Sequence, residues 1–123
     1  MLQDMQFRPV ATFSGLRRVP LLALSRNSIF PSLELRPDAL SIRVILRHEL
    51  KFEDIEKIEV AWRLAHQVTL VPKRGFRTFS ANFFSREEAE RLVVALQQRG
   101  VPLDTTALNF VRKDPEAPAN EGL

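Results

Sequence analysis

The segment from residue 50 to residue 100 constrains the fold most, because strand-like stretches lead directly into a helix that is signalled at both ends. Ser85 followed by Glu88 is the capping-box pattern, in which each side chain is expected to bond the other residue's backbone N–H. Gly100 marks the end of the helix, and four apolar residues recur at helical spacing before it: Ala89, Leu92, Val93 and Leu96. We therefore predict an amphipathic helix over residues 86–99 whose one apolar stripe lies against a sheet.

Alternating apolar and polar residues predict a series of short strands before this helix. Pro37 and Asp38 have the chemistry of a tight turn, so residues 32–36 and 40–44 are expected to form a hairpin. A second tight turn is expected at residues 53–55. The remaining strands are expected at residues 48–52, 58–63, 67–71 and 76–83.

The first thirty residues show a weaker pattern. Residues 5–13 contain β-forming side chains, but Pro9 interrupts them, which favours an edge strand or an arm over a central strand. The apolar run at residues 21–24 fits either a buried strand or one helical turn. Residues 25–28 are expected to form a loop.

One domain is expected, because 123 residues with an apolar fraction of 45% suit a single core. Within this domain, residues 1–30 are expected to form an arm or first strand, and residues 31–113 the main body. Asp104 is expected to cap a short second helix that runs through Val111. The segment 114–123 is rich in Pro, Ala and acidic residues, so we expect a disordered tail there.

The chain lacks the signals of a membrane or secreted protein. No apolar run approaches the ~20 residues that cross a bilayer, and the first residues lack the pattern of a signal peptide. There is no cysteine, which excludes disulfides and thiolate metal sites and fits a reducing compartment. We therefore expect a soluble, cytoplasmic protein.

Four segments carry a resemblance to a known family. They read Leu33-Glu-Leu-Arg-Pro-Asp-Ala-Leu-Ser-Ile-Arg, Lys51-Phe-Glu-Asp-Ile-Glu-Lys-Ile-Glu-Val, Phe79-Ser-Ala-Asn and Phe84-Ser-Arg-Glu-Glu-Ala-Glu-Arg-Leu. Over roughly residues 31–100 the chain resembles the bacterial pleckstrin-homology-like (PH-like) domains, in which a strand ends in an aromatic-acidic-acidic-Ile turn and a C-terminal helix packs on the barrel. The resemblance implies an α+β, mainly β fold: a curled antiparallel sheet or partial barrel of about six to seven strands, closed by the helix. It also implies a binding or assembly module.

Nothing in the sequence assembles a catalytic, cofactor or metal site. His48 lies near three carboxylates, those of Glu49, Glu53 and Asp54, but strand alternation sends His48 and Glu49 to opposite faces. His48 and His66 are both expected at the surface. The chain also lacks a Gly-x-Ser-x-Gly elbow and a glycine-rich phosphate loop. We therefore expect a protein that is not an enzyme and has no cofactor.

The best ligand candidate is a basic turn. Lys73, Arg74 and Arg77 place three cations within five residues at an expected hairpin loop, where they suit a phosphorylated headgroup or an acidic peptide. The alternative is a solvated hairpin turn, since strand alternation and Gly75 already account for these residues. The lipid site familiar from PH domains uses the turn between the first two strands, and here that turn, Arg36-Pro37-Asp38, has one cation beside an acid.

A secondary basic patch consists of Arg17, Arg18 and Arg26, next to Phe13. Such a patch suits RNA or an anionic membrane, but the aromatic residues that stack on bases are not interleaved with it. The net charge is only +3, and the later phenylalanines are expected in the core: Phe76, Phe79, Phe83 and Phe84. Nucleic-acid binding through this segment is therefore the weakest alternative.

The sequence thus leaves three functional hypotheses open. The first is a protein partner or self-association, through a sheet edge in the N-terminal third that accepts another strand. The second is peripheral binding of an anionic lipid headgroup through residues 73–77. The third is the nucleic-acid alternative.

Overall fold

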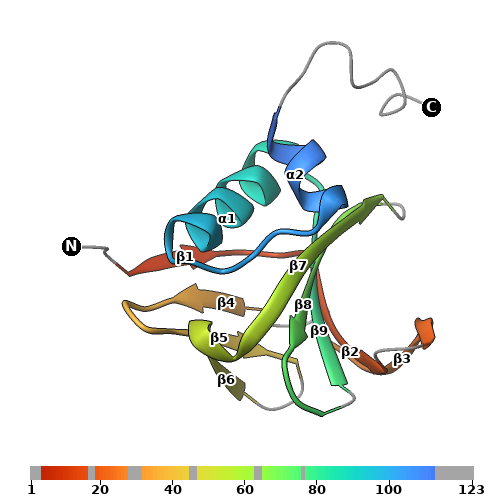
Figure 1. Cartoon of the computed structure of the whole chain (residues 1–123). Helices are drawn as coiled ribbons and strands as arrows, with labels where there is room; N and C mark the ends of the chain where they lie inside the picture. The colour runs from red at the N-terminus through yellow and green to blue at the C-terminus, as the bar shows by residue number, and fades with distance from the viewer. Residues whose placement is uncertain are drawn as a thin grey trace.

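The structure, a computed structural model, describes residues 4–16, 19–27, 32–44, 47–62, 65–75 and 77–112. Two antiparallel sheets face each other, and two helices lie at one end of them (Figure 1). The fold is therefore mainly β with two helices.

The first sheet has the order β1-β4-β5-β6. Its strands are β1 (Met5–Phe7), β4 (Ser32–Leu35), β5 (Ala39–Arg43) and β6 (Arg47–Lys51). The predicted hairpin around Pro37 and Asp38 is confirmed, and a bond from the Arg36 N–H to the Ala39 carbonyl closes its turn at 2.8 Å. The register aligns one set of side chains on the inner face: Leu33, Leu35, Leu40, Ile42, His48 and Leu50.

The second sheet has the order β3-β2-β9-β8-β7. Its strands are β2 (Ala11–Leu16), β3 (Val19–Asn27), β7 (Ile55–Trp62), β8 (His66–Pro72) and β9 (Arg77–Phe83). A short 3-10 turn, η1 (Phe52–Asp54), connects the sheets and confirms the tight turn expected there. The inner face of the second sheet carries Ile58, Val68, Leu70, Phe79, Ala81 and Phe83, which pack into the same core as the first sheet.

The N-terminal segment joins the two sheets. β1 pairs with β4 in the first sheet, whereas β2 pairs with β9 in the second. The Val10 N–H donates to the Asn82 carbonyl at 2.7 Å where the chain passes from one sheet to the other. The Thr12 hydroxyl also donates to the Arg43 carbonyl at 2.6 Å, which links β2 to β5 across the sheets.

The helix α1 (Arg86–Gln98) closes one end of the two sheets. The predicted cap is present, because the Ser85 hydroxyl accepts from the Glu88 N–H at 3.2 Å. The predicted stripe is buried, with Ala89, Leu92, Val93 and Leu96 at 0% exposure. The Glu88 carboxylate, expected to return to Ser85, instead accepts from the Arg8 N–H at 3.0 Å and so ties α1 to the chain beyond β1.

The helix α2 (Thr105–Arg112) follows a segment that lies along β7. The Ile58 N–H donates to the Pro102 carbonyl and the Asp104 N–H donates to the Ile58 carbonyl, each at 3.0 Å. The Asp104 carboxylate accepts from the Ala107 N–H at 3.0 Å, as a helix cap is expected to do. The outer edge of β7 is therefore covered by the protein's own chain.

Two expectations about the strands were wrong, and one alternative that the sequence left open is resolved. Residues 25–27 belong to β3 and not to a loop, and the run 21–24 is part of the same strand, because β2 supplies the backbone partners that the local pattern does not reveal. The described chain contains nine strands where six to seven were expected. They form two antiparallel sheets, where the resemblance implied one curled sheet or partial barrel.

Replacing Leu96 with Ala is expected to lower the free energy of unfolding by about 2–5 kcal/mol, because a fully buried side chain leaves a cavity under α1. The matched control is Gln97→Ala on the exposed side of the same helix, which is expected to change it by less than about 0.5 kcal/mol. Urea unfolding measures both. Equal losses in the two variants would contradict the position of α1.

Candidate anion-binding site

The predicted basic turn lies at the end of the sheets opposite to α1 (Figure 1). Lys73 and Arg74 are exposed, and Gly75 adopts a φ of +87°, which favours glycine at the tip of the turn. The Lys73 N–H donates to the Asp54 carbonyl at 2.8 Å, so the start of the turn is fixed to η1.

Arg77 is the first residue of β9, and its side chain is anchored at one nitrogen. Its Nε donates to the Ser14 hydroxyl at 3.0 Å, and Ser14, on β2, is fully buried. The guanidinium carbon lies 5.9 Å from the centre of the Phe79 ring. Since Arg77 is itself exposed, its inner edge is held by the protein while its outer part faces solvent.

The cations of this turn have no carboxylate partner within the part of the chain that the structure describes, in contrast to Arg36 and Lys57. Arg36 pairs with Glu34 at 2.9 Å, and Lys57 pairs with Glu59 at 3.1 Å. By contrast, Lys73, Arg74 and Arg77 form no ion pair with any described residue, and neither terminal nitrogen of Arg77 has an acceptor there. These guanidinium N–H groups suit an oxyanion.

His48 is half-buried at the same end, with its ring against the facing sheet, where a surface histidine was expected. Its ring centre is 4.8 Å from that of Phe79, with the ring planes tilted by 44°. Burial lowers the pKa of His48 below its usual value, and the positive charge of Arg77 lowers this pKa further. The register explains this position, because His48 pairs with the buried Ile42 on the inner face.

The carboxylates near His48 in sequence do not converge on it. Glu49 lies on the outer face of β6, 3.5 Å from Arg36, while Glu53 and Asp54 are exposed in η1. Arg36 also lowers the pKa of Glu34, first through its hydrogen bond, and Gln6 contributes a second hydrogen bond. No group of three or more metal-binding side chains occurs among the described residues.

His66 and Phe84 also depart from expectation. The His66 ring packs against Trp62 at 4.6 Å and Phe110 at 5.8 Å, so it lies in an aromatic cluster. Phe79 and Phe83 are buried as predicted, but Phe84 is 74% exposed because it follows the last paired residue of β9. Phe76 lies outside the described residues.

The secondary basic patch is described only in part. Arg17 and Arg18 lie outside the described residues, and Arg26 stands opposite Phe13 in the pairing of β3 with β2. The structure therefore brings together Arg77, Ser14, His48 and Phe79, of which sequence reasoning had selected only Arg77 for binding.

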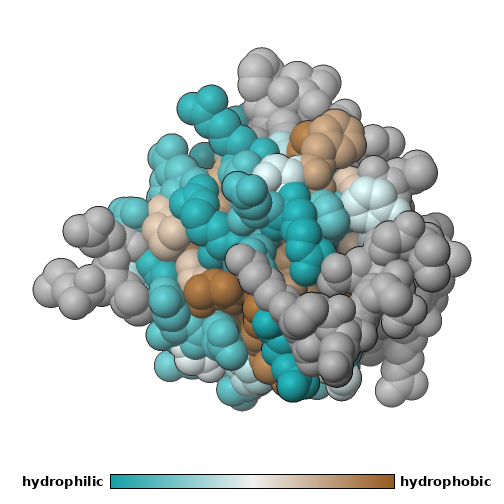
Figure 2. Space-filling model, turned by 90° about the horizontal axis from the view of Figure 1, so that it is seen from above, coloured by the Kyte–Doolittle hydropathy of each residue, from teal (hydrophilic) through white to brown (hydrophobic). Residues whose placement is uncertain are grey.

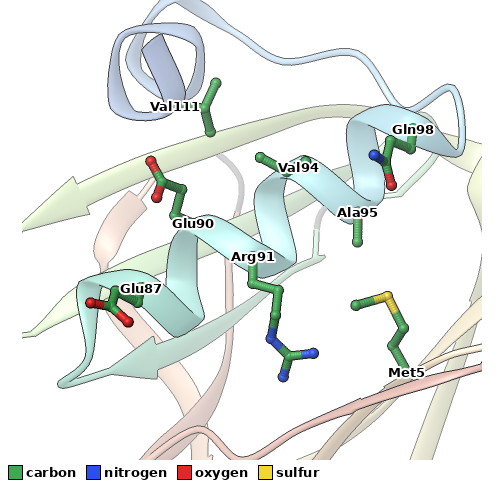
Figure 3. A pocket seen from close by; sticks show the side chains of 8 residues that line it. All are labelled: Met5, Glu87, Glu90, Arg91, Val94, Ala95, Gln98 and Val111. Carbon is green, nitrogen blue, oxygen red and sulfur yellow. The ribbon is translucent and has the colours of Figure 1, made fainter. Parts of the chain in front are cut away.

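A separate groove of about 480 Å³ lies along α1 (Figure 3). It is lined by Met5, Glu87, Glu90, Arg91, Val94, Ala95, Gln98 and Val111. Figure 2 shows that the helical side of the molecule is largely hydrophilic, with small apolar areas between polar ones. The groove contains none of the predicted site residues.

Comparison with known proteins identifies the fold. No protein-family model matches the chain, and no curated protein matches its sequence. The chain is similar to one in a solved structure, that of the Spt16D Pob3N heterodimer, with a TM-score of 0.59 and 12% sequence identity. The match covers 85% of this chain and 54% of that chain. It supports the PH-like fold that the sequence resemblance implied. In the described part of the chain, neither helix has the length and hydropathy needed to cross a membrane.

The environment of His48 predicts a pH-dependent stability. Since the folded state lowers the pKa of His48, the unfolded chain takes up this proton first, and stability is lost as the pH falls below 6.5, the usual pKa of histidine. We expect the melting temperature of the wild type to fall between about pH 7 and pH 5 more steeply than that of His48→Gln. Parallel slopes in the two proteins would contradict the lowered pKa of His48.

Proposed function

We propose that this protein is a non-enzymatic binding module that recognises an oxyanion. The site is the end of the two sheets opposite to α1, where Ser14, His48 and Arg77 lie, and we call it the open end. The observation that carries this proposal is the state of Arg77, whose Nε is fixed by buried Ser14 while its terminal nitrogens have no acceptor among the described residues. Lys73 and Arg74 add two exposed cations from the preceding turn. A bacterial PH-like family and a cytoplasmic location are consistent with this role and are part of the proposal.

A fixed guanidinium favours this function physically. Arg binds oxyanions through two parallel N–H groups, and a side chain that is already held loses less entropy when it binds. Hydrogen bonds to charged groups contribute about 1.5–3 kcal/mol, so Arg77 is expected to dominate the affinity. Lys73 and Arg74 are expected to contribute roughly 1 kcal/mol each at an anionic surface.

Replacing Arg77 with Gln is expected to weaken binding of inorganic phosphate roughly tenfold or more, measured by equilibrium titration of the purified protein. The matched control is Arg112→Gln, which removes the same charge from an exposed position at the end of α2 and is expected to leave binding unchanged. No phosphate binding by the wild type, or equal losses in both variants, would contradict the proposal.

A second experiment distinguishes a lipid headgroup from a soluble ligand as the source of the oxyanion. Vesicles that contain phosphatidic acid, compared with neutral phosphatidylcholine vesicles, test a lipid headgroup in co-sedimentation. Binding that inorganic phosphate displaces indicates a headgroup at Arg77, whereas binding of phosphate without vesicle binding indicates a soluble ligand. Capture of an acidic peptide alone indicates a protein partner at the same site.

A second candidate function is assembly through β3, which forms one edge of the second sheet. The chain covers the edge of β7 itself, and α1 contacts β1 through an Arg91 bond to the Gln6 carbonyl at 3.2 Å. The edge strand β6 carries exposed charges at alternate positions, a pattern that discourages pairing. By contrast, β3 has nine residues and an apolar sequence at 21–24. The fold-level neighbour comes from a heterodimer, which accords with this role.

Self-association through β3 predicts that two charges in this strand lower the apparent mass at high concentration. The variant is Leu22→Lys with Ala23→Lys, because charged side chains on an edge strand disfavour strand addition. The control adds the same charge at two exposed helical positions, Gln97→Lys with Asn109→Lys. Sedimentation velocity over a range of concentrations measures the effect, and a wild type that stays monomeric throughout would contradict self-association.

A further inference from the structure

Two side chains from opposite sheets contact the same aromatic ring at the open end. The His48 ring from β6 packs on Phe79 at 4.8 Å, and the Arg77 guanidinium from β9 lies 5.9 Å from the Phe79 ring centre. The strands that carry them, β6 and β9, belong to different sheets, so the sequence alone does not show that His48 and Arg77 lie near the same ring. Phe79 thus holds an imidazole and a guanidinium within one site.

Few charged groups among the described residues lie near His48. From β9 the group that acts on it is Arg77, and from β5 its pairing partner is the apolar Ile42. On its own strand, Arg47 and Glu49 lie on the opposite face of the sheet, where Arg47 donates to the Ser41 hydroxyl at 2.9 Å. No carboxylate among the described residues therefore offsets a positive charge on His48.

We propose that His48 is a second contact of the oxyanion held by Arg77, and that it makes this contact in its protonated form, so that anion binding and proton uptake are coupled. The inference rests on the proposed anion-binding function. The ligand class is an oxyanion with at least two free oxygens, such as a sulfate or phosphate group. One oxygen accepts from the terminal nitrogens of Arg77 and another accepts from the imidazolium.

The coupling follows from the electrostatics of the empty site. Without a ligand, burial and the nearby guanidinium both oppose protonation of His48. A bound anion offsets the charge of Arg77 and adds a negative charge beside the imidazole. Linkage is reciprocal, so the same free energy that raises proton affinity on anion binding raises anion affinity on protonation.

Sulfate is the appropriate probe, because its own charge stays constant between about pH 5.5 and pH 8. Imidazole carbon-bound proton signals, followed by NMR across this range, give the pKa of each histidine with and without sulfate. We expect sulfate to raise the pKa of His48. His66 is the internal control, because it pairs with Phe83 at the other end of β9, about 20 Å from Arg77, and its titration is expected to stay unchanged.

Direct titration gives the second readout. Sulfate affinity of the wild type is expected to rise roughly fivefold or more between about pH 8 and pH 5.5. His48→Gln is expected to lose most of this rise, so that its sulfate affinity changes little between pH 8 and pH 5.5. If that variant does not fold, the shift of the wild-type His48 titration by sulfate decides the question alone.

The outcomes separate this inference from the proposed function. Sulfate binding that depends on Arg77 but is flat with pH, with no movement of the His48 titration, would overturn the inference and leave the anion site standing. No binding that depends on Arg77 anywhere in the pH range would overturn the anion function itself, and the inference with it.

Discussion

Burial of the apolar stripe of α1 against two facing sheets is the contact on which the other features of this molecule depend. The sheets have apolar inner faces, and α1 closes one end of the space between them. Two side chains of the same helix bond to the chain at β1: the Glu88 carboxylate accepts from the Arg8 N–H, and Arg91 donates to the Gln6 carbonyl. Neither of the two helices among the described residues lies over the opposite end, where His48, Ser14 and Arg77 lie on the inner faces.

The open end is held by polar contacts where the closed end is held by apolar packing. Ser14 is fully buried, and its hydroxyl receives the Arg77 Nε–H. A buried hydroxyl that is bonded to a fixed cation avoids the cost of an unsatisfied polar group, and it directs the remaining guanidinium N–H groups outward. The candidate binding group is therefore positioned by the fold before any ligand arrives.

Local patterns in the sequence identified the elements that depend on local physics. Alternation located β4, β5, β7, β8 and β9, and the Ser85 and Asp104 caps located both helices. The end of the strand β3 was missed because residues 25–27 have turn-forming composition, and only pairing with β2 makes them extended. Residues 21–24 of the same strand were left open between a strand and a helical turn. Arg77 was selected from its neighbours in the chain. Ser14, which bonds to it, and His48, which packs on the same Phe79 ring, lie on strands far away in sequence. Because His48 pairs with the inward-facing Ile42, strand alternation could have predicted that His48 faces inward. No local pattern in the sequence indicates the role of Ser14.

The central claim is that the open end presents a fixed guanidinium to an oxyanion. A map of backbone amide and Arg Nε–H chemical shifts during a sulfate titration tests it most directly. The largest changes are expected at the Arg77 Nε–H and at the amides of residues 73–75, Phe79 and Ser14, with little change along α1. Changes of similar size spread over all exposed basic residues, or centred on the groove along α1, would contradict it.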